Sequence, residues 1–176
     1  MLGTNRMTPL PIAIQAALAA LALIAAFTDL RKREIPNWLT VGGVAAGLAL
    51  NTWISGWAGL KSAALGLGLA ALVFVPIFVM RWLGGGDVKL MAAIGALAGP
   101  ANVMVIFVLD AIFGGVVALA AILLRGRLVK TLRNITRMFQ PEREAELEAG
   151  NEKSMGLPRA VTIAAATLLV LWASRA

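Results

Sequence analysis

Three aspartates lie at or inside apolar stretches of this chain: Asp29, Asp87 and Asp110. The other acidic residues lie in polar segments. A carboxylate is costly to place in a hydrocarbon layer, so an acid in such a setting indicates a functional site. Two carboxylates in contact cannot both ionise cheaply, and they therefore share a proton near neutral pH. Such a pair can activate a water molecule and protonate an amide nitrogen, which is the chemistry that peptide hydrolysis needs.

The rest of the composition narrows the chemistry further, because the 176 residues include no cysteine and no histidine. This composition excludes sites that need either residue: disulfides, thiol nucleophiles, zinc clusters and an imidazole base. Proton chemistry falls to carboxylates, and we expect no metal ion and no other cofactor. The net charge of +7 comes from cations in short loops between apolar runs, where lipid headgroups are the commoner partner. We therefore expect membrane lipid, and no nucleic acid, as a partner.

The elements that position these acids are predicted to be membrane-spanning helices. The chain is 60% hydrophobic with a mean hydropathy of +0.84, and a helix needs roughly 20 apolar residues to cross a bilayer. We predict an all-α polytopic membrane protein, a single domain over residues 1–176, with about six transmembrane helices. Glycine and proline place turns at Gly56 to Gly59 and at Gly99 and Pro100. The predicted helices occupy residues 8–28, 38–60, 62–80, about 87–98, the stretch between Gly99 and Arg125, and residues 157–173.

Charge placement predicts the orientation, because Lys and Arg concentrate in cytoplasmic loops. With the N-terminus in the periplasm, all of the 16 Lys and Arg residues except Arg6, Lys61 and Arg175 fall on the cytoplasmic side. Asp29, at the end of the first helix, and Asp87, at the start of the fourth, then share the cytoplasmic face. A cytoplasmic loop over about 125–157 is expected to hold an amphipathic helix on anionic lipid and an acidic hairpin.

Two short motifs surround the paired aspartates. The first is Asp-Leu-Arg-Lys-Arg-Glu-Ile-Pro-Asn over residues 29–37, and the second is Gly-Gly-Gly-Asp-Val-Lys-Leu over residues 84–90. The glycines leave the backbone unshielded where an extended substrate could lie, although three glycines alone would indicate only a turn. Taken with six helices, the two motifs resemble those of the type IV prepilin peptidase family, whose members are aspartic peptidases of the GxGD type. The resemblance covers nearly the whole chain.

The resemblance implies that Asp29 and Asp87 are the catalytic pair. The implied substrate is the leader of a prepilin or pseudopilin precursor, cut at the cytoplasmic face of the bacterial inner membrane. The remaining motif residues are expected to have positioning roles: Gly84, Gly86, Lys89, Pro36 and Asn37. Pro36 and Asn37 would set the turn into the second helix, with Asn37 as its N-cap. Lys89 could contact the substrate, tune the acids or anchor the helix at the interface.

One departure from the larger members of this family concerns methyl transfer. Those members add a cysteine-rich cytoplasmic region that methylates the new N-terminus, whereas this sequence has no cysteine and, as we expect, no room before the first helix. We therefore expect peptidase activity alone, as in the compact enzymes of Tad-type (Flp) pili. The oligomeric state is not predicted.

Two other functions stay open. A membrane ion or proton carrier would need Asp110 as a relay, and a non-catalytic pilus-assembly subunit would tolerate loss of either acid. Asp110 itself is expected mid-helix, roughly 20 Å from the cytoplasmic end of its helix at 1.5 Å per residue. We expect it to be protonated or paired within the bundle, without a catalytic role.

Overall fold

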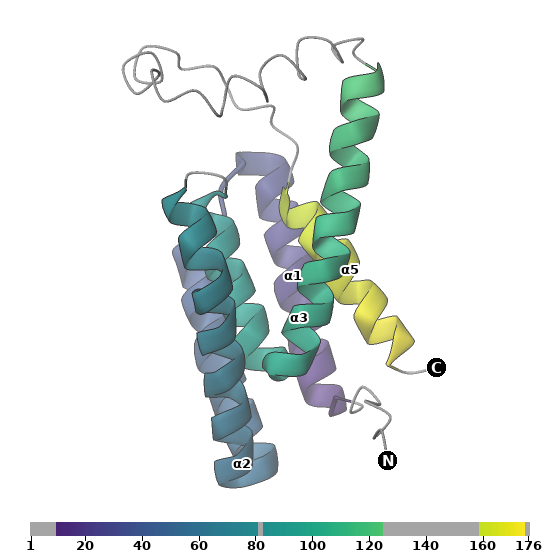
Figure 1. Ribbon diagram of the computed structural model, residues 1–176. Helices are drawn as coiled ribbons and strands as arrows, with labels where there is room; N and C mark the ends of the chain where they lie inside the picture. The colour runs from purple at the N-terminus through teal and green to yellow at the C-terminus, as the bar shows by residue number, and fades with distance from the viewer. Residues whose placement is uncertain (1–9, 81–82, 125–158, 175–176) are drawn as a thin grey trace, which may run out of the picture. The chain divides into compact units, whose positions relative to one another are not determined.

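The computed structural model describes residues 10–80, 83–124 and 159–174. Among these residues the chain is helical and contains no strand, which confirms the all-α prediction for this part. The chain forms two compact units: the described residues of the first are 10–80, 83–111 and 159–174, and those of the second are 112–124. The helices are α1 (Ile12–Lys32), α2 (Asn37–Val79), α3 (Gly85–Leu124) and α5 (Arg159–Ala173) (Figure 1).

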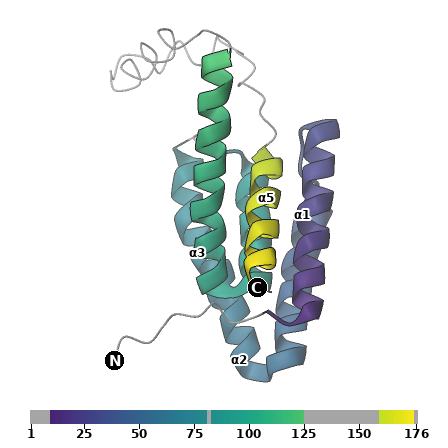
Figure 2. The same ribbon diagram turned by 90° about the vertical axis from the view of Figure 1, so that its right-hand side faces the viewer.

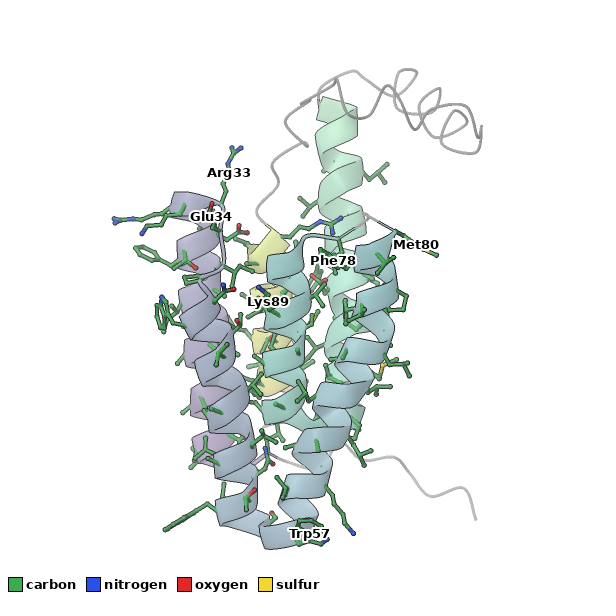
Figure 3. The ribbon with its side chains drawn as sticks, turned by 90° about the vertical axis from the view of Figure 1, so that its left-hand side faces the viewer. Arg33, Glu34, Trp57, Phe78, Met80 and Lys89 are labelled. Atoms are coloured by element: carbon green, nitrogen blue, oxygen red, sulfur yellow. The ribbon has the colours of Figure 1, made fainter. Side chains whose placement is uncertain are left out.

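Two of these helices contain a break at a glycine. Gly56 in α2 has φ 57° and ψ −136°, and Gly99 in α3 has φ 77° and ψ 175°. Positive φ is accessible to glycine without the steric cost that a Cβ would impose. Pro100 follows the second break, where a first helical turn does not need its N–H. Both breaks lie at the predicted turns, and Figure 3 shows α2 reversing direction beside Trp57.

The helices have the length and surface expected in a bilayer. The described part includes three helices long and apolar enough to cross a membrane: α1, α2 and residues 85–117 of α3. The shorter helix α5 is apolar and has 15 residues. Large apolar side chains face outward, and Trp53 is 90% exposed. A helical array with an apolar exterior is typical of a membrane protein. The number of crossings, about six, stays a prediction.

Small residues bring α2 close to the first segment of α3. A Cβ added at Gly47 would lie 2.6 Å from the carbonyl carbon of Ala96, so only a glycine fits there. Beside this contact, the Asn51 amide nitrogen lies 2.9 Å from the Gly47 carbonyl oxygen and 3.1 and 3.2 Å from those of Ala96 and Leu97. Small residues allow backbones to approach in membranes, and polar side chains then bond across the helices. The segment that begins with Asp87 is thereby held against α2.

Helix α1 packs against α5 and α2, and Figure 2 shows α1 and α5 side by side. Leu18, Ala22 and Ala25 of α1 are fully buried, as is Ala166 of α5. Burial of such apolar surface stabilises roughly in proportion to its area. The packing brings the last turn of α1, which carries Asp29, beside the first turn of α5.

Some predicted boundaries need correction. Helix α1 continues past the apolar run to Lys32 and ends at Arg33, which has φ 54° and donates its N–H to the Asp29 carbonyl oxygen. Asp29 therefore lies in the last turn and does not end the helix. The prediction that Asn37 is an N-cap is wrong, because Pro36 precedes the first helical residue and no side chain caps α2. The amphipathic helix and the acidic hairpin predicted over about 125–157 lie outside the described residues.

Candidate active site

Asp87 lies at the start of α3, as the helix's third residue. Its side chain is only 9% exposed and accepts a hydrogen bond from the Gly84 backbone N–H. The Asp87 N–H in turn donates to the Gly84 carbonyl oxygen at 3.1 Å. A side chain that returns from the third helical position to the N–H of the residue before the helix makes one half of a capping box. A Cβ at Gly84 would lie 3.3 Å from Asp87 Oδ2, so the glycine leaves room for this carboxylate.

Asp29 is held by a different helix end. Its Oδ2 accepts a hydrogen bond from the Ala160 backbone N–H at 2.9 Å. Ala160 is the second residue of α5, and the first N–H groups of a helix have no partner within it. The carboxylate of Asp29 therefore satisfies a donor that would otherwise be unpaired at the buried Ala160. A negative side chain at this position is also favoured by the helix dipole.

The two aspartates belong to one electrostatic cluster. The charges of Arg159, Asp29 and Asp110 all act on the Asp87 carboxylate. Arg159 is the first residue of α5. The structure thus brings the ends of α1, α3 and α5 together around these acids, although the catalytic role of Asp29 and Asp87 stays a prediction. Within the described residues, no three acidic side chains are grouped so that they could hold a metal ion.

The two sequence motifs also meet. A Cβ at Gly86 would lie 3.3 Å from Cβ of Ile35, so the loop between α1 and α2 rests against the start of α3. The exposed Lys89 ammonium donates to Asn37 Oδ1 at 2.8 Å, which gives both side chains a positioning contact. Pro36 accepts the Leu39 N–H at 3.1 Å as α2 begins. Figure 3 shows Glu34 and Lys89 toward the same end of the first unit, with Trp57 at the other.

Asp110 lies mid-helix in α3, 14 residues before Leu124, as predicted. Its Oδ1 accepts a hydrogen bond from Thr162 Oγ1 at 2.7 Å, and Thr162 is the fourth residue of α5. The groups that bond Asp29 and Asp110 are therefore two residues apart on α5, about 3 Å along its axis. Asp110 is paired, as expected, and its charge also acts on the Asp87 carboxylate.

Sequence reasoning missed the contribution of α5. Arg159 was counted only as a loop cation, and Ala160 acts through its backbone N–H, which has no sequence signature. Thr162 could have been noticed as a hydroxyl near the start of the apolar helix predicted over residues 157–173. That signal is weak, because threonines in helices commonly bond to their own backbone.

Comparison with known proteins identifies a family. The pattern of the Type IV leader peptidase family matches residues 16–119. The chain belongs to this family.

Among curated proteins, a prepilin leader peptidase/N-methyltransferase of Bacillus subtilis (strain 168) is 32% identical over 114 residues, which are 63% of this chain and 45% of that protein. A protein of the same name from Burkholderia pseudomallei (strain 1026b) is 34% identical over 128 residues, 64% of this chain and 40% of its own length. The chain thus spans less than half the length of these relatives. No solved structure matches significantly.

Proposed function

We propose that this chain is a membrane-embedded aspartic endopeptidase that cleaves the leader of prepilin-like precursors with Asp29 and Asp87. The observation that carries the proposal is that each acid is held by a helix N-terminus and that the charge of Asp29 acts on the Asp87 carboxylate. Membership of the Type IV leader peptidase family and the names of the relatives support the substrate class. A prepilin or pseudopilin precursor is therefore the proposed partner.

In the proposed reaction, one carboxylate removes a proton from a water molecule, whose oxygen attacks the scissile carbonyl carbon. The other carboxyl group protonates the leaving amide nitrogen as the C–N bond breaks. The proposal assigns these two roles to the pair of carboxyl groups and not to one residue each. The extended leader would lie along the Gly84 to Gly86 backbone, which carries no side chains there. This scheme requires no cofactor.

We also propose that the pair faces the cytoplasm of a bacterial inner membrane, with the N-terminus in the periplasm and about six crossings. The basic loop that contains Arg33 lies at the same end of the first unit as Glu34 and Lys89, as Figure 3 shows. Trp57 lies at the opposite end, and exposed tryptophans are typical of membrane interfaces. Methyl transfer, named for the relatives, is not part of the proposal, because the sequence has no cysteine.

The carrier alternative is less well supported. A proton carrier needs titratable groups at successive depths. Among the described residues, Asp110 and Asp29 instead accept hydrogen bonds from the same turn, the first turn of α5.

Co-expression with a candidate prepilin tests the proposal. We expect uncut precursor with Asp29→Asn and with Asp87→Asn, because an amide can neither activate water nor donate a carboxyl proton. Glu34→Gln is the matched control, since Glu34 is an exposed acid at the same end of the unit, and it should leave cut pilin. Cleavage that persists in either aspartate variant would reject the pair and favour a non-catalytic subunit.

A further inference from the structure

The first turn of α5 is attached on two sides. Toward α1, the Ala160 N–H donates to Asp29 Oδ2, and Ala160 is fully buried. Toward α3, Thr162 Oγ1 lies 2.7 Å from Asp110 Oδ1. The Thr162 hydroxyl also lies 2.8 Å from the Arg159 carbonyl oxygen, so it ties the start of the turn to the same contact. A shift of this turn would therefore move the donor that holds Asp29.

The Asp110–Thr162 contact is well suited to fix such a turn. It joins two residues 52 positions apart in the sequence and is partly buried. Hydrogen bonds with a carboxyl partner in a low-dielectric setting are stronger than those exposed to water. Neither side chain is needed for the proposed hydrolysis itself, which uses Asp29, Asp87 and water.

We propose that Asp110 and Thr162 are positioning residues, whose hydrogen bond keeps the first turn of α5 where the Ala160 N–H orients the Asp29 carboxylate. This inference rests on the proposed function. It gives Asp110 a structural role that does not require it to transfer a proton.

The expected effect falls on the chemical step. Misplacing a reacting group by about 1 Å can cost on the order of a hundredfold in rate. We expect Asp110→Leu and Thr162→Val each to lower kcat by roughly tenfold to a hundredfold while KM stays within about twofold, because substrate binding does not depend on this contact.

Conservative variants separate positioning from direct chemistry. Asp110→Asn should keep most of the activity, because an amide offers both a donor and an acceptor to Thr162. Thr162→Ser should do the same, since it keeps the hydroxyl. The double variant Asp110→Leu/Thr162→Val should lose no more than either single variant, as expected for two partners of one bond.

A second threonine of α5 offers a matched control. Thr167 is buried and bonds only to the Ile163 carbonyl oxygen of its own helix among the contacts described. Thr167→Val should therefore keep the wild-type kcat. The assay uses the full-length chain in lipid vesicles with a prepilin peptide. Wild-type kcat in Asp110→Leu or Thr162→Val, a loss confined to KM, or an Asp110→Asn variant as inactive as Asp110→Leu would each overturn the proposal.

An activity-independent measurement guards against simple misfolding. Because the chain has no cysteine, two can be introduced for spin labels, at the exposed Leu23 of α1 and Leu169 of α5. Asp110→Leu should broaden the distance distribution between the labels, and Asp110→Asn should leave it narrow. An unchanged distribution in Asp110→Leu would overturn the positioning role.

The two proposals can fail separately. If Asp29→Asn and Asp87→Asn still cleave, the peptidase assignment fails, and the label distances still test the attachment of α5. If both aspartate variants are inactive while Asp110→Leu and Thr162→Val cleave at the wild-type rate, only the positioning role fails.

Discussion

The glycines at the start of α3 matter because they have no side chain, which lets neighbouring groups approach the backbone. Gly84 leaves room for the Asp87 carboxylate, and Gly86 leaves room for Ile35. Among the described glycines, positive φ occurs at Gly56 and Gly99 and not in the Gly84 to Gly86 run. The sequence indicated an unshielded backbone in this run, and the structure shows in addition that Asp87 and Ile35 lie close to it. That requirement could not be predicted, because it depends on which loop rests against the glycines.

We predict that Gly86→Ala lowers the cleavage rate by roughly tenfold, because the added methyl group pushes the Ile35 loop away from α3. Combining it with Ile35→Ala should restore part of the rate by removing the bulk that the methyl group meets. Gly68→Ala serves as the control, since a Cβ there meets nothing within 4 Å. Prepilin cleavage kinetics would measure this, and wild-type rates in Gly86→Ala would contradict it.

The positions of individual acids were predictable to different degrees. Asp29 and Asp87 stand out because each interrupts apolar sequence beside a motif. The mid-helix position of Asp110 was predictable from the length of the apolar run, but its partner was not. Its true neighbour is Thr162, close to the beginning of α5, and no sequence spacing links positions 52 residues apart.

At the scale of elements, glycine decides both where helices break and where they touch. The breaks at Gly56 and Gly99 were predictable, because glycine and proline punctuate long apolar runs. The contact of Gly47 with the Ala96 backbone was not, since a glycine inside a helix can equally face open space, as Gly42 does. Only the packing of α2 on α3 distinguishes the two.

The pair Gly47 and Gly42 supplies a matched test of this packing. Gly47→Ala should destabilise the fold by about 1–3 kcal/mol, because its Cβ would overlap the backbone of the neighbouring helix. Gly42→Ala should be neutral or slightly stabilising, since alanine favours helix and nothing lies within 4 Å. Thermal unfolding in detergent would compare the two variants. Equal stabilities would show that the helices do not approach so closely in solution.

At the scale of the whole molecule, composition and charge placement were enough to predict an all-α membrane protein, and the two motifs were enough to predict its family. Helix ends were less predictable. The basic residues after Asp29 were assigned to a loop, yet cations are favourable in the last turn of a helix, and α1 continues through Arg31 and Lys32. The role of α5 arises only when distant segments pack, so it was not predictable from local sequence.

The most direct measurement is prepilin cleavage by the purified full-length chain in lipid vesicles, comparing Asp29→Asn, Asp87→Asn and the double variant. Groups that act as one catalytic unit show losses that do not add. We expect each single variant to lose at least about a thousandfold in kcat. The double variant should lose no more kcat than the less active of the two single variants. Either single variant cleaving within tenfold of the wild-type rate, or a double variant whose loss is the product of the two, would contradict a shared aspartate pair.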